Sequence, residues 1–407
     1  MKLLTLKAFK TTALVGAMFI APVLVSHTPI APMLSVQAIA QEDEEQETRR
    51  VPAMSPRVGR AFEPVLEVFE IEEPTEAQWR ESLELLQSYD IERWNGYERA
   101  MFWRYQAGIY ASLEDFENMK RCFEEMLAYR NDVQPRMEQD TILTLARLEA
   151  MEENWDGALR WLTEWWGLVP SPNVDAYELR AMINYNKSNF RDALSDLDYV
   201  VAAEETESGK AKERNYQMQF GVYSELNRNA DMLSVSETLV RHYPSRANWN
   251  RLWAMYLDRD DQQKALAAMQ AAHDQGFLDR ESHYSTFSSV WNQASNPYLA
   301  AKYFEEGMEA GIVEKSQKNW EYLANWWYQA REYRRSIQAR EQAARTSDDG
   351  ENYSLLARAE LSEGMYEEAA QSAREALQKG GLRDTAEVHL IQGQAYLALK
   401  RYEDAKS

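Results

Sequence analysis

The stretch Gly393-Gln394-Ala395-Tyr396, followed by Leu399, Tyr402 and Ala405, carries the pattern that decides the fold. Small and apolar residues about three positions apart lie on one stripe of a helix, and the stripe continues past a turn into a second helix. The spacing therefore predicts a helix–turn–helix unit. One copy of so loose a pattern has little weight unless the chain repeats it.

The same register recurs in eight earlier copies, beginning at residue 100. Characteristic residues of these copies, in chain order, are Trp103, Ala107 and Tyr110; Leu145, Ala146 and Ala158; Tyr177, Ala181 and Ala193; Tyr216, Tyr223 and Leu239; Trp249, Leu252 and Tyr256; Tyr284, Phe287 and Trp291; Trp320, Leu323 and Trp327; Tyr353, Leu356 and Ala357. From Trp103 to His389, which share one position of the pattern, eight periods span 286 residues, a mean just under 36 with spacings of 33 to 39. A period of this length indicates a repeat array.

This pattern resembles the tetratricopeptide repeat (TPR), whose consensus runs Trp-x2-Leu-Gly-x2-Tyr, then Ala-x3-Phe, with proline near its end. The resemblance implies an all-α fold, a right-handed superhelical solenoid of antiparallel helix pairs with a concave inner wall. A single pair cannot bury its own apolar faces, so neighbouring pairs stack and share one core. The expected organisation is a signal peptide at 1–40, a disordered linker at 41–60, capping helices from a degenerate repeat at 61–99, and an array of about nine repeats at 100–407, the last incomplete.

The first forty residues read as an export signal. Lys2, Lys7 and Lys10 precede an apolar run at 11–25, and Ala38-Ile39-Ala40 predicts cleavage after Ala40. No cysteine stands near that point, which excludes a lipoprotein anchor. The alternative is an uncleaved membrane anchor, but the run is shorter than the ~20 residues that a span needs. In a bacterium, a cleaved signal places the mature protein in the periplasm.

The segment after the signal lacks a helical stripe. Acidic residues fill 42–47 and arginines follow, with Pro52 and Pro56 between them, so the segment is expected to be a linker. Two short amphipathic helices are then predicted at 62–69 and 79–86. Thr75 and Gln78 form a predicted capping box at the start of the second.

The final copy ends soon after Ala405, one turn into its second helix, which leaves Tyr396 and Tyr402 without a covering helix. We expect from this that the chain is a fragment. The alternative is a natural end of unusual form.

Charge and composition limit the classes of function that the chain can have. The net charge is −21, from 66 acidic and 45 basic residues, and so acidic a chain repels nucleic-acid backbones. The single cysteine, Cys122, cannot form an internal disulfide and lies on a predicted apolar helix face. A buried, inert thiol is therefore expected there, with a reactive thiol as the alternative.

No catalytic, cofactor-binding or metal-binding motif is present, so the sequence predicts a non-enzyme without a cofactor. His242, His273, His283 and His389 are not spaced as metal ligands, and His389 is expected to pack between helices because it occupies the position of the consensus tryptophan. The tryptophans, which include Trp161, Trp165, Trp166, Trp326 and Trp327, have two interpretations: packing between helices, or a platform for a carbohydrate or a protein partner.

The expected functional surface is the concave wall, which first-helix positions 2, 5, 9, 12 and 13 line in the TPR family. Those positions here are Arg104, Arg147, Tyr185, Asn186, Gln217, Asn250, Asn292, Gln293, Asn325, Tyr328, Gln329 and Arg358. Seven of the twelve are carboxamides, which both donate and accept hydrogen bonds and so suit the backbone of an extended peptide. The hypothesis is a peptide-binding groove. The alternative is that exposed helix positions are simply polar.

Several strings outside the repeat consensus add a second resemblance. They are residues 49–55 (RRVPAMS), 168–173 (LVPSPN), 272–276 (AHDQG), 297–302 (PYLAAK), 347–351 (SDDGE) and 379–382 (KGGL). Together they are similar to exported TPR proteins of Gram-negative bacteria that accompany TonB–ExbB–ExbD systems. The resemblance implies a periplasmic scaffold whose protein partners are members of the TonB/ExbB/ExbD complex, which drives uptake, typically of iron–siderophores. The acidic block at 42–47 departs from that family.

Two other functions remain open at this point. One keeps the fold and changes the partner, making the chain an accessory of outer-membrane or envelope-polysaccharide assembly. The other is enzymatic, a helical solenoid that positions a catalytic domain on peptidoglycan. The enzymatic reading needs such a domain, whereas helices and repeats fill the chain from residue 62 to its end.

Overall fold

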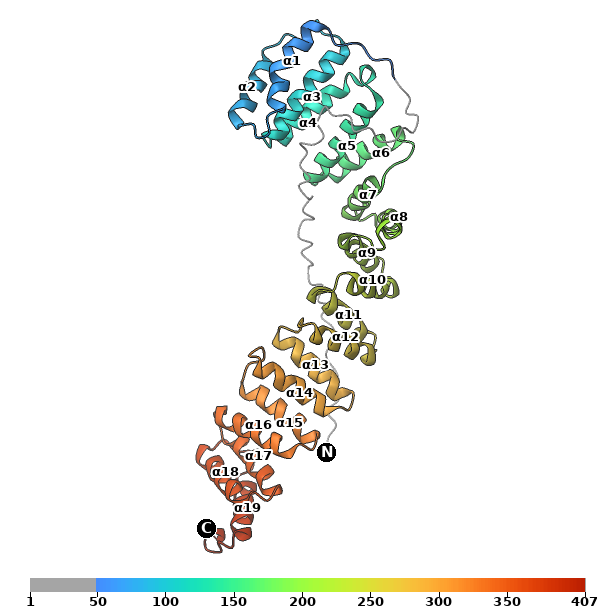
Figure 1. Ribbon diagram of the computed structural model, residues 1–407. Helices are drawn as coiled ribbons and strands as arrows, with labels where there is room; N and C mark the ends of the chain where they lie inside the picture. The colour runs from blue at the N-terminus through green and yellow to red at the C-terminus, as the bar shows by residue number, and fades with distance from the viewer. Residues whose placement is uncertain (1–48, 407) are drawn as a thin grey trace. The chain divides into compact units, whose positions relative to one another are not determined.

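The computed structural model describes residues 49–406, and throughout that range the regular structure is helical, with no strand (Figure 1). The expectation of an all-α fold is therefore confirmed. The predicted signal peptide and the acidic block at 42–47 lie outside the described residues. Among the described helices, none combines the length and the apolar character needed to cross a bilayer.

The chain divides into two compact units, of which unit 1 runs to Leu226 and unit 2 begins at Asn227. Unit 1 contains α1 (Pro56–Phe69), α2 (Glu76–Gln87), α3 (Gly96–Ser112), α4 (Phe116–Leu127), the 3-10 turn η2 (Arg130–Asp132), α5 (Pro135–Met151), α6 (Trp155–Leu168), α7 (Val174–Asn186), α8 (Phe190–Ser208) and α9 (Glu213–Glu225).

Unit 2 contains α10 (Asn229–His242), α11 (Arg246–Asp258), α12 (Gln262–Asp274), α13 (Glu281–Gln293), α14 (Pro297–Glu309), α15 (Gln317–Gln329), α16 (Tyr333–Thr346), α17 (Glu351–Ser362), α18 (Tyr366–Lys379), α19 (Thr385–Ala398) and the 3-10 turn η3 (Asp404–Lys406). The boundary between the units thus falls between α9 and α10, inside the copy whose sequence pattern is weakest.

The predicted repeats match the observed helix pairs. Every odd-numbered helix from α3 to α19 is the first helix of a copy, and successive first helices begin 33 to 39 residues apart. The small residues of the pattern lie where first helices approach their neighbours. Ala107, Ala146, Ala181, Ala324 and Ala357 are all 0% exposed. A side chain larger than a methyl group would separate the helices there, so this periodicity is a packing requirement of TPR-type pairs.

The turn inside each copy has one repeated geometry. The residue two positions before the second helix adopts a positive φ, as at Glu114, Glu153, Ser295 and Arg331, with φ between 56° and 63°. The next residue donates its N–H to a carbonyl five positions back, for example Glu332 N to Trp327 O at 2.9 Å. Among the turns from α3 to η3, only Gly364 uses a glycine, so most copies accept the cost of a left-handed side-chain residue.

Buried amides join successive copies in unit 2. Asn319 on α15 donates to Glu281 Oε1 on α13 at 3.0 Å, and Asn352 on α17 donates to Glu321 Oε1 on α15 at 2.9 Å. Asn319 and Asn352 are 5% and 6% exposed. Because a buried amide without a partner is unfavourable, each bond favours one register between neighbouring copies.

The segment before the array is more ordered than the sequence predicted. Residues 49–60 were expected to be disordered, but α1 already begins at Pro56, capped by Ser55. Arg49 forms an ion pair with Glu138 at 3.0 Å, and Ser55 N donates to Glu98 Oε1 at 2.7 Å. The linker prediction is therefore wrong for residues 49–60. The prediction missed both the polar bonds to α3 and α5 and the burial of Val58, which begins the apolar stripe of α1.

Two helices precede the array near the predicted positions. The capping box at Thr75 and Gln78 opens α2 as expected. Phe62 of α1 and Leu86 of α2 are buried in a cluster with Phe102 and Ile109 of α3. The pair α1–α2 thus covers the apolar side of the first repeat.

Candidate functional site

The structure places all twelve predicted wall residues on first helices, and we describe them separately in each unit. Unit 1 carries Arg104 on α3, Arg147 on α5, Tyr185 and Asn186 on α7, and Gln217 on α9. Unit 2 carries Asn250 on α11, Asn292 and Gln293 on α13, Asn325, Tyr328 and Gln329 on α15, and Arg358 on α17. Seven are exposed, namely Asn186, Gln217, Gln293, Asn325, Tyr328, Gln329 and Arg358, and the other five are half-buried.

Many of the wall amides already have a partner within their own unit. Asn186 donates to Met182 O, and Gln217 donates to Glu213 Oε1. The carboxamide of Asn325 accepts from Arg340. The wall is therefore not a row of unengaged amides, and Gln293 and Gln329 are the exposed carboxamides with no hydrogen-bond partner among the described residues.

In unit 1, carboxylates and arginines alternate along the wall. Burial lowers the pKa of the Arg147 guanidinium, and the carboxylates of Asp175 and Asp140 act in the opposite direction. Burial raises the pKa of Asp140, and Arg136, Arg104 and Arg147 oppose that rise. Positive and negative groups thus neutralise each other on this wall. Tyr185 packs beside Gly221, where an added Cβ would lie 3.1 Å from its hydroxyl.

Unit 2 contains a wall residue that sequence reasoning missed, Arg340 on α16. Its Nη2 donates to Asn325 Oδ1 on α15 at 2.9 Å, although Arg340 belongs to a second helix. Burial lowers its pKa, the nearby Tyr328 and Glu321 oppose that change, and Arg358 of α17 adds to it. Within residues 49–406 no carboxylate forms an ion pair with Arg340. The family's wall positions are all on first helices, so they could not indicate this residue.

The carboxylate that acts on Arg340, that of Glu321, accepts hydrogen bonds from other residues. Glu321 Oε1 accepts from Asn352 at 2.9 Å and from Gln317 at 2.9 Å. Arg358 pairs with Glu387 on α19. The tyrosine beside this cluster, Tyr328, is 55% exposed. Arg340 therefore combines a partly desolvated cation with an open aromatic neighbour.

Asn250 belongs to a separate series of polar contacts in unit 2. Its Nδ2 lies 3.3 Å from His283 Nε2, and His283 Nδ1 faces Asp279 Oδ1 at 3.5 Å. Burial lowers the pKa of His283, against the opposing effect of Asp279. With the proton on Nδ1, the ring can accept from Asn250 through Nε2. The arrangement links α11 to α13 and leaves the oxygen of Asn250 buried rather than presented on the surface.

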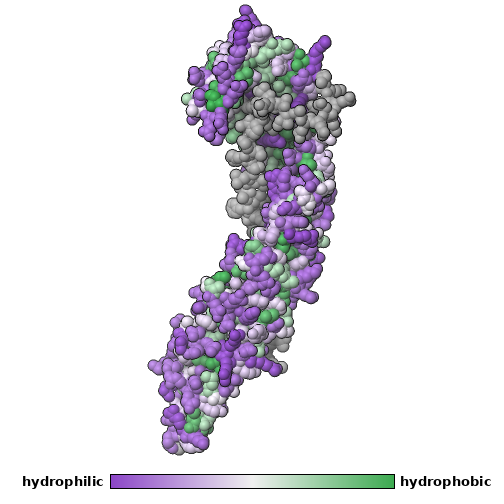
Figure 2. All heavy atoms as spheres, viewed as in Figure 1, coloured by the Kyte–Doolittle hydropathy of each residue, from purple (hydrophilic) through white to green (hydrophobic). Residues whose placement is uncertain are grey.

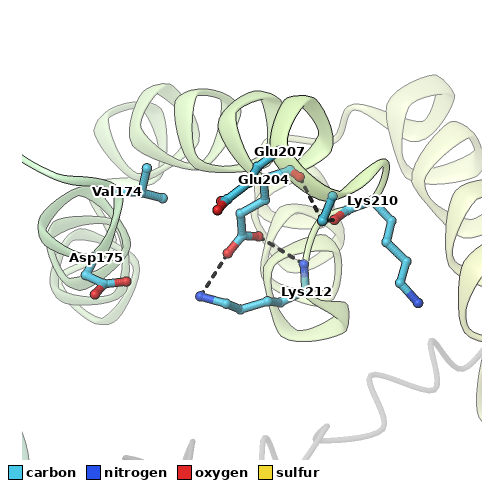
Figure 3. Close-up of a pocket in the computed structure, with 7 residues that line it drawn as sticks. Val174, Asp175, Glu204, Glu207, Lys210 and Lys212 are labelled. Carbon is cyan, nitrogen blue, oxygen red and sulfur yellow. Dashed lines mark hydrogen bonds and ion pairs between the residues drawn. The ribbon is translucent and has the colours of Figure 1, made fainter.

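A small polar pocket of about 180 Å³ lies in unit 1 between the start of α7 and the loop after α8 (Figure 3). Glu204 accepts from the backbone N–H of Lys212 at 2.9 Å and pairs with its ammonium at 2.9 Å. Burial alone would raise the pKa of Glu204, but these bonds and that of Asn215 lower it. Helix α8 continues through Ser208, so Glu204 and Glu207 reach the pocket from its last turns. Two of the five charged residues that line the pocket, Glu204 and Lys212, are thus paired with each other.

Other predicted residues have clear places. Cys122 is buried, as predicted, and burial raises the pKa of its thiol to about 12, which disfavours the reactive thiolate. In the described range, no group of three or more His, Cys, Asp or Glu side chains is arranged to hold a metal ion. His389 was expected to pack between helices, but it is exposed. That prediction is wrong, because α19 buries Val388 and Ile391 and leaves His389 outside this face.

The tryptophans serve mainly in packing. Trp165, Trp326 and Trp327 are 5%, 8% and 0% exposed, and Trp161 and Trp166 pack half-buried against the core of unit 1. On the face shown in Figure 2, hydrophilic residues predominate and hydrophobic ones form small separate patches.

Comparisons with known proteins agree with the helical architecture and add little more. No protein-family model matches this sequence, and no curated protein matches it. The solved structures that it resembles include the TPR2AB domain of yeast Sti1 in a pHSP90 complex, with 14% identity, a TM-score of 0.34, and coverage of 67% of this chain and 99% of that chain.

Two further solved structures are a TPR protein from Parabacteroides merdae ATCC 43184 and YrrB, described as a TPR protein with an unusual peptide-binding site. The first has 12% identity and a TM-score of 0.34, covering 64% of this chain and 99% of that one. YrrB has 12% identity and a TM-score of 0.32, covering 50% and 97%. Similarity this low carries no argument about function, and the TPR assignment rests on the repeated helix pairs themselves.

Proposed function

We propose that this chain is a non-enzymatic scaffold that binds an extended segment of a protein partner along its first helices. One observation carries the proposal: the first helices of unit 2 expose polar side chains without a hydrogen-bond partner among the described residues, together with a largely exposed tyrosine that packs on one side against Tyr333. Gln293, Gln329 and Tyr328 lie on this surface, and Tyr328 is 55% exposed. Amide groups can satisfy both the N–H and the C=O of an extended backbone, while a tyrosine adds contact area at low entropic cost.

Repeat architecture supports the same function. Each copy contacts its neighbours, so the array extends a surface without needing a deep pocket. The pocket in Figure 3 is small, and its Glu204 and Lys212 pair with each other. A repeated polar surface is suited to a polypeptide rather than to a small molecule, which requires a mostly apolar pocket.

The proposed location and partner come from the sequence. A basic start, an apolar run and Ala38-Ile39-Ala40 support export to the periplasm, with cleavage after Ala40. The strings between repeats, such as residues 168–173 and 272–276, support an accessory role in a TonB–ExbB–ExbD system. In that role the scaffold contacts a periplasmic part of the energy-transducing complex and performs no chemistry.

Site-specific crosslinking tests this function in a Gram-negative host that carries the gene. A photoreactive residue at Gln329, on the wall of unit 2, is expected to crosslink to TonB, ExbB or ExbD. The same residue at Gln338, exposed on the second helix α16, serves as the control. Recovery of outer-membrane or polysaccharide-assembly proteins from Gln329, and of no member of the TonB complex, would replace the proposed partner with the alternative one.

A separate measurement tests the location. Amino-terminal sequencing of the protein released from the periplasm is expected to begin at Gln41. Retention of residues 1–40 in a membrane fraction would contradict the cleaved signal and favour the anchor.

A further inference from the structure

The turn between α15 and α16 in unit 2, with the start of α16, exposes arginines and tyrosines that we call the basic edge. Its members are Arg331, Tyr333, Arg334 and Arg335, together with Tyr298 at the start of α14, and all five residues are exposed. Trp327 joins the two copies, because the Arg335 guanidinium lies 4.4 Å from the centroid of its ring and the Tyr298 ring lies 5.4 Å from it. Two successive copies therefore build one surface.

Two arginines of the basic edge are not used by the fold. Among the described residues, no hydrogen bond, ion pair or ring contact involves the side chain of Arg331 or of Arg334. Burial raises the pKa of Glu305 on α14 and Arg335 opposes that rise, but within the described part of the chain the two form no ion pair. A guanidinium fork can donate two parallel hydrogen bonds to the oxygens of a phosphate group. The basic edge thus presents donors suited to a phosphate.

The charge of the basic edge is opposite to that of the chain. Residues 326–335 contain three arginines and one glutamate, a local charge of +2, in a chain whose net charge is −21. The equivalent ten residues of the copy before, 290–299, carry no charge, whereas those of the copy after, 359–368, carry four glutamates and no base. Exposed charges more than about 10 Å apart are largely screened at about 0.1 M salt, so the local balance governs a contact here. The glutamates of the following copy limit the basic edge on that side.

The tyrosines distinguish the basic edge from a simple cluster of charges. Tyr298 and Tyr333 are 44% and 37% exposed, and each contacts an aromatic ring of α15, that of Trp327 or that of Tyr328. A tyrosine has an apolar ring and a polar hydroxyl, which suits the boundary between lipid headgroups and acyl chains. Arginines beside such rings combine attraction to phosphate with apolar contact. An anionic lipid surface meets both requirements, and a soluble anion meets only the first.

We propose that the basic edge docks on the surface of a membrane that contains anionic phospholipids. Arg331, Arg334 and Arg335 donate to lipid phosphates, while Tyr298 and Tyr333 lie among the headgroups. The contact is peripheral, since none of the described helices could span a bilayer. It goes beyond the proposed function because it gives the scaffold a second ligand. Wall residues such as Gln329 lie on first helices, so a docked edge and a bound protein segment use different side chains.

Vesicle co-sedimentation with the full chain tests the membrane contact. Vesicles of phosphatidylcholine alone are compared with vesicles that also contain about 40% phosphatidylglycerol, which supplies the anionic surface. We expect binding to the anionic vesicles to be about 10-fold tighter, and to weaken when the salt is raised from about 0.1 M to about 0.5 M, because salt screens exposed charges. Equal binding to both kinds of vesicle, or no binding to the anionic ones, overturns the proposal.

Paired arginine variants test whether the basic edge, rather than the net charge, makes the contact. Arg331→Gln combined with Arg334→Gln is expected to weaken binding to anionic vesicles about 10-fold. The control is Arg57→Gln combined with Arg60→Gln, which makes the same charge change at two exposed arginines of α1, also three residues apart, and is expected to alter binding less than about 2-fold. Equal losses in the two double variants contradict the proposal.

Thermal unfolding of the same variants separates binding from a structural role. Because Arg331 and Arg334 are exposed and make no contact that an unfolded chain would lose, Tm should not change in their double variant. Weaker vesicle binding together with a lower Tm would assign these arginines to the fold and overturn the basic edge as a docking surface.

Tyrosine variants separate a lipid surface from a soluble anion. Tyr333→Ser keeps every charge and is expected to weaken vesicle binding about 3-fold, whereas Tyr366→Ser, at the equivalent position of the next copy and also 37% exposed, is expected to leave it unchanged. Equal binding by these two variants would show that charge alone acts, as with a soluble polyanion, and would overturn the lipid assignment. Loss of the Gln329 crosslinks in the double variant of Arg331 and Arg334, with vesicle binding unchanged, would assign the basic edge to the protein partner instead.

Discussion

Buried carboxylates in unit 1 have cations or N–H donors as partners, whereas the buried Glu360 in unit 2 has no opposite charge. In unit 1, Arg147 lies near Asp140 and Asp175. In unit 2, Arg340 has a single neutral partner in Asn325. The same repeat architecture therefore compensates its charged groups to different degrees in the two units.

Glu149 and Glu360 show the same difference at one position of the repeat. Each accepts, through its backbone carbonyl, the N–H that follows the left-handed turn, and each is at most 6% exposed. Glu149 pairs with Lys120 at 3.7 Å and accepts from Asn154 at 2.6 Å. Glu360 has no cation, and its Oε2 is buried without a hydrogen-bond partner among the described residues.

The pKa of Glu360 is shifted because its carboxylate is buried and has no cation beside it. Burial raises the pKa of Glu360 to about 7, a hydrogen bond with Ser372 of α18 opposes the rise, and Glu368 of α18 and Glu341 of α16 add to it. Several other copies place an aromatic residue here, such as Tyr110, Trp327 and Tyr396. What the two glutamates teach is that the repeat position fixes burial, while a neighbouring copy decides whether the charge is compensated.

The largest effect is expected from removing the partner of Glu149. Lys120→Met leaves a buried carboxylate with only Asn154 to stabilise it, and we expect a loss of about 3 kcal/mol in the free energy of unfolding. Urea denaturation of the full chain measures it, with Glu152→Gln as the control because that glutamate is the exposed partner of Lys120. A loss no larger than that of Glu152→Gln would show that the pairing in unit 1 contributes no stability.

A smaller effect of opposite sign is expected at Glu360. Its folded-state pKa is above that of the unfolded chain, so this residue contributes stability at acidic pH that is lost as the pH rises through about 7. Glu360→Gln should therefore stabilise the protein by about 2 kcal/mol at pH 8 and have little effect near pH 4.

Urea denaturation across that pH range, with the exposed Glu363→Gln as the control, tests the prediction for Glu360. If both variants follow the pH dependence of the wild type, Glu360 is compensated by a group other than the neighbours named above, and the contrast between the two glutamates disappears.

The smallest effect concerns a feature that both units share. Glu153 in unit 1 and Arg331 in unit 2 adopt φ of 58° and 63° in equivalent turns. Replacing either with glycine removes the left-handed strain but adds entropy to the unfolded chain, for a net gain of about 0.5 kcal/mol. Thermal unfolding should give similar shifts for Glu153→Gly and Arg331→Gly. Shifts of opposite sign would mean that the turns, as well as the charges, differ between the units.

The repeats were predicted well from the sequence because the packing that requires them joins residues close together in the chain. The small residues at Ala107 and Ala357 and the capping box at Thr75 report on one helix and its nearest neighbour, so their spacing is visible in the chain. Reasoning failed where a contact joins distant segments. The order of residues 49–60 depends on Glu98 and Glu138, which no pattern in that segment reveals.

The candidate site was predicted only in part. Asn325, Tyr328 and Gln329 were identified from their first-helix positions and are exposed as expected. Asn250 was identified by the same rule, but its amide faces His283. Arg340 was missed because its reach from α16 to Asn325 depends on the angle at which two helices pack.

The sequence by itself determined the all-helical repeat, its period and the buried small residues, because helix propensity and periodic burial act between near neighbours. Only the tertiary structure decided which charges have partners, since Lys120 and Glu149, or Arg340 and Asn325, meet through packing between helices. A charge in the chain has no partner until that packing supplies one. This is why the array was evident from Gly393 to Ala405, while the difference between the two units was not.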